Sequence, residues 1–220
     1  MDTRNYLKIK ENLPKNVNLL AVSKGFRVDQ IKQIYELGQK DFGESKFQEA
    51  YEKQSFLNDI KNIRWHFLGN IQSNKIRKIV KNFDYIHSVD SYKKLLKISS
   101  VAGEIGKTSK IMLQLKFAND PQKGGMDSDE ILSKWEEIQK ISNLKIMGLM
   151  TINPKGLSSE ENFKLFSRCR QIADSLKLVD CSMGMSNDWK EAISAGSTWL
   201  RLGSVLFGER FNSKNINNKE

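Results

Sequence analysis

The sequence is poor in several residue types, and each shortage excludes a class of protein. Its 2 cysteines, Cys169 and Cys181, cannot form the disulfide framework of a small secreted domain and suit a reducing compartment. Its 2 histidines, His66 and His87, belong to no Cys/His cluster with the spacing of metal ligands, so we expect no metal site. No apolar run approaches the roughly 18 residues that cross a bilayer. The N-terminal residues are polar and lack the apolar core of a signal peptide, so we expect a soluble, cytoplasmic protein.

Proline is also scarce, at positions 14, 121 and 154 only, and no Pro/Gly/Ser-rich linker divides the chain. A chain of 220 residues can bury a substantial core as one domain. We therefore expect residues 1–211 to form one domain. Residues 212–220 carry too few apolar side chains to pack, which predicts a disordered polar tail.

The formal net charge of +10 raises the possibility of a nucleic-acid-binding module. The excess comes from lysines spread over the whole chain, without an arginine-rich stripe or a patch of interleaved aromatic and basic residues. The sequence therefore disfavours a nucleic-acid partner. Salt-sensitive binding of the protein to a nucleic-acid duplex or single strand would support the nucleic-acid-binding hypothesis instead. Anionic small molecules remain suitable ligands for such a surface.

Strand-like and helix-like segments alternate along the chain. Short apolar or β-branched runs predict strands at residues 17–24, 40–43, 63–68, 85–89, 110–117, 144–151, 178–183 and 198–202. Helical periodicity predicts helices at residues 3–11, 28–37, 47–57, 74–80, 127–141, 160–176 and 188–195, and a further helix capped by Asp90 or Ser91. Eight strands in such alternation predict a single-domain (β/α)8 TIM-type barrel with an extra N-terminal helix.

Lys24 ends the first predicted strand, and Gly25 follows it at once. Chemistry in α/β folds collects at the C-terminal ends of strands. An ammonium that loses hydration in an apolar mouth deprotonates more easily and becomes a nucleophile toward carbonyls. The alternative is a lysine that caps the strand and extends into water.

Small residues follow the last two predicted strands. The turn 182–186 leads into a short helix, where its hydroxyl and N–H groups can face an anion. Gly203 and Ser204 can offer backbone N–H groups at close approach. Loops after strands 7 and 8 of barrels often bind phosphate, so the sequence predicts a phosphate cradle here. The alternative is two ordinary Gly/Ser turns.

Six motifs, taken together and in this order, resemble the YggS/PROSC family of pyridoxal phosphate homeostasis proteins. The resemblance runs from about Leu19 to Arg210 and covers nearly the whole predicted domain. That family is similar to the barrel domain of alanine racemase standing alone. The motifs are Ala-Val-Ser-Lys (21–24), Trp-His-Phe-Leu-Gly (65–69), Gln-Ser-Asn-Lys (72–75), Gly-Leu-Met-Thr (148–151), Ser-Met-Gly-Met-Ser-Asn-Asp (182–188), and Gly-Ser-Thr (196–198) with Arg-Leu-Gly (201–203).

The resemblance implies a role for each matched residue in binding pyridoxal 5′-phosphate (PLP). Lys24 would form a Schiff base with the cofactor aldehyde, and Arg201 would face the pyridine nitrogen. The phosphate would be held by Ser186, Gly203 and Ser204. The pocket around the ring would be lined by His66, Asn70, Met150 and Met183.

Two positions depart from the family's pattern. The family usually has Asn where this chain has Ser45, and Thr where it has Ser204. Serine at 204 keeps the hydroxyl and the backbone N–H, so the phosphate site is hardly affected. Ser45 and Lys46 change the second loop, and the sequence leaves the contacts of that loop with the cofactor open.

The predicted site lacks groups that efficient turnover needs. A guanidinium beside the pyridine nitrogen disfavours protonation of the ring, and an unprotonated pyridine is a poor electron sink. A racemase also needs an acid or base on each face of its substrate. In alanine racemase the second base is a tyrosine from a C-terminal β-domain, which we expect to be absent because the chain ends soon after the last strand. None of the 5 tyrosines follows a predicted strand at the mouth.

We therefore predict a monomeric carrier that holds PLP for homeostasis or delivery to apo PLP-dependent enzymes, with no catalytic residues. The alternative is a PLP-dependent enzyme with weak racemase-like activity, using His66 or a cysteine as its base. Of the remaining titratable groups, we expect His87 to be a structural histidine at the end of its strand. We expect Glu44 and Glu49 to be solvated or helix-starting carboxylates.

Overall fold

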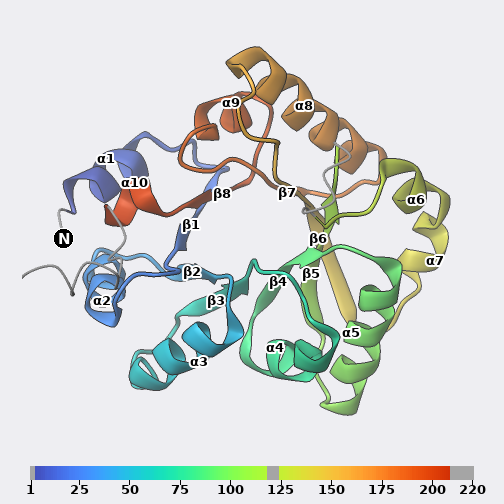
Figure 1. The fold of residues 1–220 in the computed structure, drawn as a ribbon, viewed down its shortest axis with the longest axis horizontal. Helices are drawn as coiled ribbons and strands as arrows, with labels where there is room; N and C mark the ends of the chain where they lie inside the picture. The colour runs from blue at the N-terminus through green and yellow to red at the C-terminus, as the bar shows by residue number, and fades with distance from the viewer. Residues whose placement is uncertain (1–2, 118–123, 209–220) are drawn as a thin grey trace, which may run out of the picture.

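Eight parallel strands form a closed barrel in the computed structural model, which describes residues 3–117 and 124–208 (Figure 1). Each strand pairs with the next in the chain, and the last pairs with the first. This confirms the predicted (β/α)8 barrel. The strands are β1 (Asn18–Val22), β2 (Asp41–Glu44), β3 (Arg64–Phe67), β4 (Tyr85–Val89), β5 (Ser109–Leu115), β6 (Leu144–Thr151), β7 (Asp180–Ser182) and β8 (Trp199–Leu202).

The helices lie outside the ring of strands, with α1 beside α10 where the chain closes the barrel (Figure 1). No helix in the described part of the chain is long and apolar enough to cross a membrane. The helices are α1 (Arg4–Asn12), α2 (Val28–Glu36), α3 (Phe47–Phe56), the 3₁₀ turn η1 (Ser73–Lys75), α4 (Ile76–Asn82), α5 (Tyr92–Glu104), α6 (Ser128–Ser133), α7 (Trp135–Gln139), α8 (Ser159–Ser175), α9 (Trp189–Ser194) and α10 (Ser204–Phe207).

The strands are buried on both faces, because one face packs against helices and the other fills the barrel. In β1, Leu19 and Ala21 belong to the large apolar cluster between barrel and helices. Leu20 points the other way and packs inside the barrel with Met112, Met150 and Trp199. This alternation explains why the strand segments are apolar without a break, and it directs Val22 and Lys24 toward the barrel mouth.

Two details differ from the sequence prediction, and one open alternative is decided. The helix expected at 127–141 is two short helices, because the backbone at Lys134 leaves helical angles (φ −99°, ψ 5°). The short helix α10 was not predicted. The cap of α5 is Ser91, one of the two residues that the sequence offered, since its hydroxyl accepts a hydrogen bond from the Lys94 N–H at 3.4 Å. The predicted polar tail 212–220 lies outside the described residues.

Candidate functional site

A pocket of about 140 Å³ lies at the C-terminal end of the barrel. It is built by residues that end or follow strands β1, β2, β3, β6, β7 and β8, so chain segments far apart in sequence converge on one cavity. The lining residues are Val22, Lys24, Ser45, Leu68, Met150, Ile152, Met185, Ser186, Arg201, Gly203 and Ser204. Lys24, Met150, Ser186, Arg201, Gly203 and Ser204 were all predicted from the sequence, and the structure brings them together.

Lys24 sits at the first corner of a tight turn directly after β1. The Phe26 N–H donates to the Ser23 carbonyl at 3.0 Å, and Gly25 has φ +75°. These are the features of a type II turn, whose third residue needs a positive φ that glycine adopts without strain. The turn therefore explains the glycine after Lys24, because a glycine at this position lets the chain change direction directly after the lysine.

The Arg201 guanidinium, on β8, borders the pocket and is held by hydrogen bonds to residues of β6 and β7. Its Nη1 donates to the carbonyl and the hydroxyl of Ser182, and its Nη2 donates to the Thr151 carbonyl at 2.8 Å. These three described bonds use three of the five guanidinium N–H groups. Burial lowers the pKa of Arg201 to about 10, so the side chain is still a cation at neutral pH and keeps donors for an acceptor in the pocket.

The hydroxyls of Ser186 and Ser204 meet on the other side of the pocket, with their oxygens 3.3 Å apart. Gly203 lies between Arg201 and this pair. A Cβ at Gly203 would come within 3.2 Å of the Val22 carbonyl oxygen, a tight contact that explains why a glycine stands there. Two hydroxyl groups next to a backbone without a side chain form a small surface that can donate hydrogen bonds to an anion.

The turn at 182–186 contributes less to this surface than the sequence predicted. The Ser182 side chain is fully buried and points into the barrel rather than into the pocket. The Met185 N–H donates to the Asp188 carboxylate at 2.6 Å, which satisfies it within the turn. Within the turn 182–186, Met185 and Ser186 border the pocket.

A chain of hydrogen bonds runs down the barrel interior from Arg201. Ser182 Oγ lies 2.8 Å from Arg201 Nη1 and 2.9 Å from His87 Nδ1. His87 Nε2 lies 2.9 Å from His66 Nδ1, and His66 Nε2 lies 3.0 Å from Asp41 Oδ1. Arginine can only donate and a carboxylate only accepts. One consistent pattern therefore has every donor pointing from Arg201 toward Asp41, with each neutral imidazole protonated at Nε2.

The titration directions agree with neutral histidines between two charged ends. Burial lowers the pKa of His66 despite the neighbouring Asp41 carboxylate. Burial, His66 and Arg201 together lower the pKa of His87 well below its usual value. Although burial raises it, hydrogen bonds from Arg64 and His66 hold the pKa of Asp41 below its ordinary range. The expectation of a structural role for His87 agrees with these contacts.

Three residues expected around the ring lie elsewhere. His66 is inside β3, paired in register with Tyr85 at the start of β4, and so sits one layer below the mouth. Asn70 is exposed and accepts a hydrogen bond from Lys94 at 3.2 Å. Met183 is fully buried in the apolar cluster outside the barrel, because strand alternation turns it away from the inward-facing Ser182.

The expectation of solvated carboxylates after β2 was wrong for Glu44. Its side chain is completely buried and bonds to Ser23 Oγ and Lys53 Nζ at 2.7 and 2.8 Å. Glu49 does start α3, as expected, and it pairs with Lys53 one turn later at 2.7 Å. The one sequence signal for this cluster was the i,i+4 spacing of Glu49 and Lys53.

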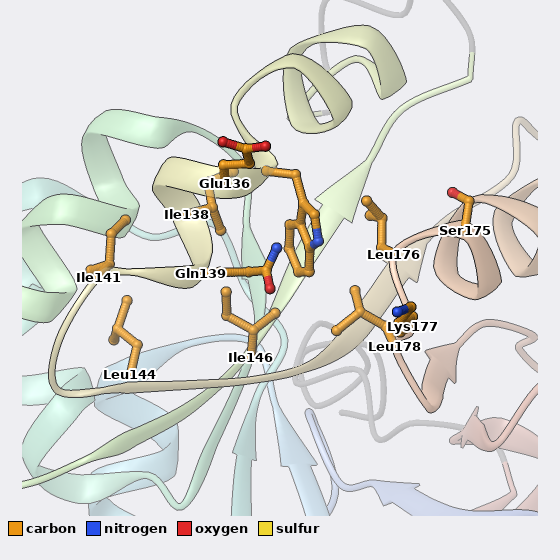
Figure 2. Close-up of a pocket in the computed structure, with 11 residues that line it drawn as sticks. Glu136, Ile138, Gln139, Ile141, Leu144, Ile146, Ser175, Leu176, Lys177 and Leu178 are labelled. Atoms are coloured by element: carbon orange, nitrogen blue, oxygen red, sulfur yellow. The ribbon is translucent and has the colours of Figure 1, made fainter.

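A second cavity, of about 600 Å³, lies outside the barrel between α7 and the end of α8. Figure 2 shows the side chains of Ile138, Ile146 and Leu176 around this hollow. Leu144 and Leu178 place it at the N-terminal ends of β6 and β7, opposite the mouth. None of the site residues predicted from the sequence lines it, so the pocket with Lys24 and Arg201 is the stronger candidate for chemistry.

Comparisons with known proteins place this chain in a known class of protein. The family described as "Alanine racemase, N-terminal domain" matches residues 3–211. An alanine racemase of Clostridium difficile has the same barrel (TM-score 0.77, 16% identity, 95% of this chain and 56% of that chain covered). At this identity the likeness concerns the fold alone.

Two curated relatives are named pyridoxal phosphate homeostasis protein. The one from Synechocystis sp. is 42% identical over 211 residues, which covers 93% of this chain and 97% of the relative. The one from Pseudomonas aeruginosa is 36% identical over 199 residues, covering 90% and 86%. The chain belongs to the family of pyridoxal phosphate homeostasis proteins, as its motifs predicted.

Solved structures of PipY from Synechococcus elongatus give the same result. The structure without PLP has a TM-score of 0.92 and 40% identity, and covers 94% of this chain and 100% of that one. The structure with PLP bound has a TM-score of 0.90 and 39% identity, and covers 94% and 99%.

Proposed function

We propose that this chain binds PLP in the mouth pocket as a Schiff base on Lys24, and that it acts in intracellular PLP homeostasis or delivery. The observation that carries the proposal is the shared pocket, since Lys24, Arg201, Ser186 and Ser204 border one cavity. The PLP bound to a relative at 39% identity supports the same ligand here.

The residues present match the chemical groups of PLP. Lys24 offers an amine for the aldehyde, and Arg201 offers N–H donors to a pyridine nitrogen that accepts. Ser186 and Ser204, with the backbone at Gly203, face the phosphate. The ring would lie against four apolar side chains at the ends of β1, β3 and β6: Val22, Leu68, Met150 and Ile152. When bound, PLP supplies an aldehyde that a primary amine captures reversibly.

Holding the cofactor fits the site better than rapid turnover. Arg201 keeps a positive charge where protonation of the pyridine would have to occur, and this weakens carbanion chemistry. Both ring nitrogens of His66 are engaged inside the barrel. A hydrogen bond with Cys181 and burial raise the pKa of the Cys169 thiol well above its usual value, and both cysteines are fully buried. The bases considered for an enzyme therefore lie away from the pocket.

The Schiff base is tested on the purified protein. After addition of PLP, we expect visible absorbance from an imine, and borohydride reduction followed by peptide mapping should place the adduct on Lys24. The Lys24→Ala variant should lose the absorbance and the adduct, whereas Lys46→Ala, in the exposed neighbouring loop, should keep both. Label on another lysine, or none, would overturn the proposal.

The carrier role is tested by two assays on the loaded protein. We expect it to restore activity to an apo-aminotransferase faster than the Lys24→Ala protein mixed with the same PLP. We expect no robust exchange of the Cα proton in a screen of amino acids. Robust racemase or transaminase turnover would favour the enzyme alternative instead. Sedimentation should report a monomer.

A further inference from the structure

A buried ionic cluster lies directly behind the Lys24 turn, on the helix side of the barrel. Lys53, on α3, is only 6% exposed. Its Nζ donates three hydrogen bonds: to the Ser23 carbonyl at 2.7 Å, to Glu44 Oε1 at 2.8 Å and to Glu49 Oε1 at 2.7 Å. All three ammonium protons are therefore used.

The cluster forms hydrogen bonds with the backbone on both sides of Lys24. The Ser23 carbonyl belongs to the peptide unit before Lys24, and Lys53 holds it. The Gly25 N–H belongs to the peptide unit after Lys24, and it donates to Glu49 Oε1, the same oxygen that accepts from Lys53. Glu44 completes the cluster by accepting from the Ser23 hydroxyl.

We infer that Lys53, with Glu44 and Glu49, is a positioning group that fixes the Lys24 turn so that the lysine amine points at the mouth pocket. This inference rests on the proposed Schiff base at Lys24. Type II turns need no buried ion pair to form, so the turn alone does not account for a desolvated lysine and a fully buried carboxylate at this point. Burying such charges costs free energy, which their pairing offsets only when the geometry is good and the remaining protons and lone pairs are hydrogen-bonded.

The geometry makes a selective prediction. The hydrogen bonds described for the cluster reach the backbone around Lys24, and none of them reaches a residue proposed to face the phosphate or the pyridine nitrogen. Weakening the cluster should slow imine formation between Lys24 and the PLP aldehyde. It should leave the affinity for the ring and the phosphate unchanged. Pyridoxine 5′-phosphate, which carries an alcohol in place of the aldehyde, measures that affinity by itself.

The test compares Lys53→Met with Lys107→Met. Lys107 is a matched control, because it is a half-buried lysine whose Nζ donates to two backbone carbonyls, those of Val80 and Phe83, at the opposite end of the barrel. We expect Lys53→Met to slow imine formation with PLP about tenfold, the order expected from a misplaced reacting group. Affinity for pyridoxine 5′-phosphate should stay within about twofold. Lys107→Met should change neither.

A second pair of variants avoids leaving a buried charge unpaired. Glu49→Leu removes the acceptor of the Gly25 N–H, whereas Glu49→Gln keeps an amide oxygen there. We expect imine formation to slow in the leucine variant and to recover largely in the glutamine variant. Wild-type rates in both Lys53→Met and Glu49→Leu would refute the positioning role. Equal losses in imine formation and in pyridoxine 5′-phosphate affinity would refute it as well. Absence of an imine in the wild-type protein would refute the proposed function instead.

Discussion

The two buried histidines predict a specific loss of stability on mild acidification. His66 and His87 are both completely buried, and their folded-state pKa values are lowered. The unfolded chain therefore binds protons, from about pH 6.5 downward, that the folded chain does not bind. Their contribution to stability is intact above that pH and is lost as the pH falls.

The size of this loss follows from linkage. A histidine with an unfolded pKa of about 6.5 that stays neutral when folded loses RT ln(1 + 10^(6.5 − pH)) of stability, about 1.4 kcal/mol between pH 7.5 and 5.5. Two such histidines give up to about 2.7 kcal/mol. Glu44 acts in the opposite sense, because burial raises its pKa and the folded state takes up its proton more readily. The informative quantity is therefore the difference between wild type and a histidine variant.

Urea unfolding at pH 7.5 and pH 5.5, followed by circular dichroism, measures the effect. The His87→Gln variant keeps an amide that can hydrogen-bond but cannot titrate. We expect it to be less stable than wild type at pH 7.5, yet to lose about 1.4 kcal/mol less than wild type on going to pH 5.5. If variant and wild type lose the same free energy between the two pH values, the neutral histidine chain is refuted.

Three further predictions follow. Nitrogen-15 NMR at pH 7 should find His66 and His87 neutral and protonated at Nε2; a protonated Nδ1 on either ring would contradict the donor direction given for the chain. Arg201→Gln should weaken pyridoxine 5′-phosphate binding about tenfold and lower the free energy of unfolding by about 2–4 kcal/mol, because buried acceptors lose charged donors. Calorimetry measures the affinity, and an unchanged value would exclude Arg201 from the ligand contacts. Gly148→Ala should destabilise the barrel by more than about 3 kcal/mol in urea unfolding, since a Cβ there would lie 1.9 Å from the Asp180 carbonyl oxygen. A urea midpoint close to that of the wild type would show that β6 and β7 can separate.

The barrel was predictable because its signals are local. Continuous apolar runs of strand length, separated by helical periodicity, occur eight times in succession and leave few alternatives to a closed parallel sheet. The mouth was also predictable, since any residue directly after a parallel strand lies at the same end of the sheet. Lys24, Gly203 and Ser204 follow from this rule, whereas the role of Arg201, which lies inside β8, was expected only from the family resemblance.

The features that could not be predicted depend on the register between strands and on contacts between residues distant in sequence. The family resemblance placed His66 near the ring, but its depth in the barrel depends on the pairing of β3 with Tyr85 of β4, which single-strand patterns do not reveal. Glu44 looked like a surface carboxylate because its partners come from other parts of the chain, Ser23 from the turn after β1 and Lys53 from α3. Burial of a charged group can be read from sequence only when its partner is known.

The two ends of the pocket are supported by separate networks, and this separation has a consequence for function. Behind Lys24, the Lys53 cluster lies between barrel and helices. Beneath Arg201, the chain through His87 to Asp41 lies inside the barrel. No hydrogen bond described for either network joins it to the other. Substitutions in the two should therefore add in free energy, one affecting capture of the aldehyde and the other recognition of the ring. Under the proposed function, breaking the Schiff base would leave the ring and phosphate contacts in place, so the protein would still hold the cofactor after the covalent bond is released.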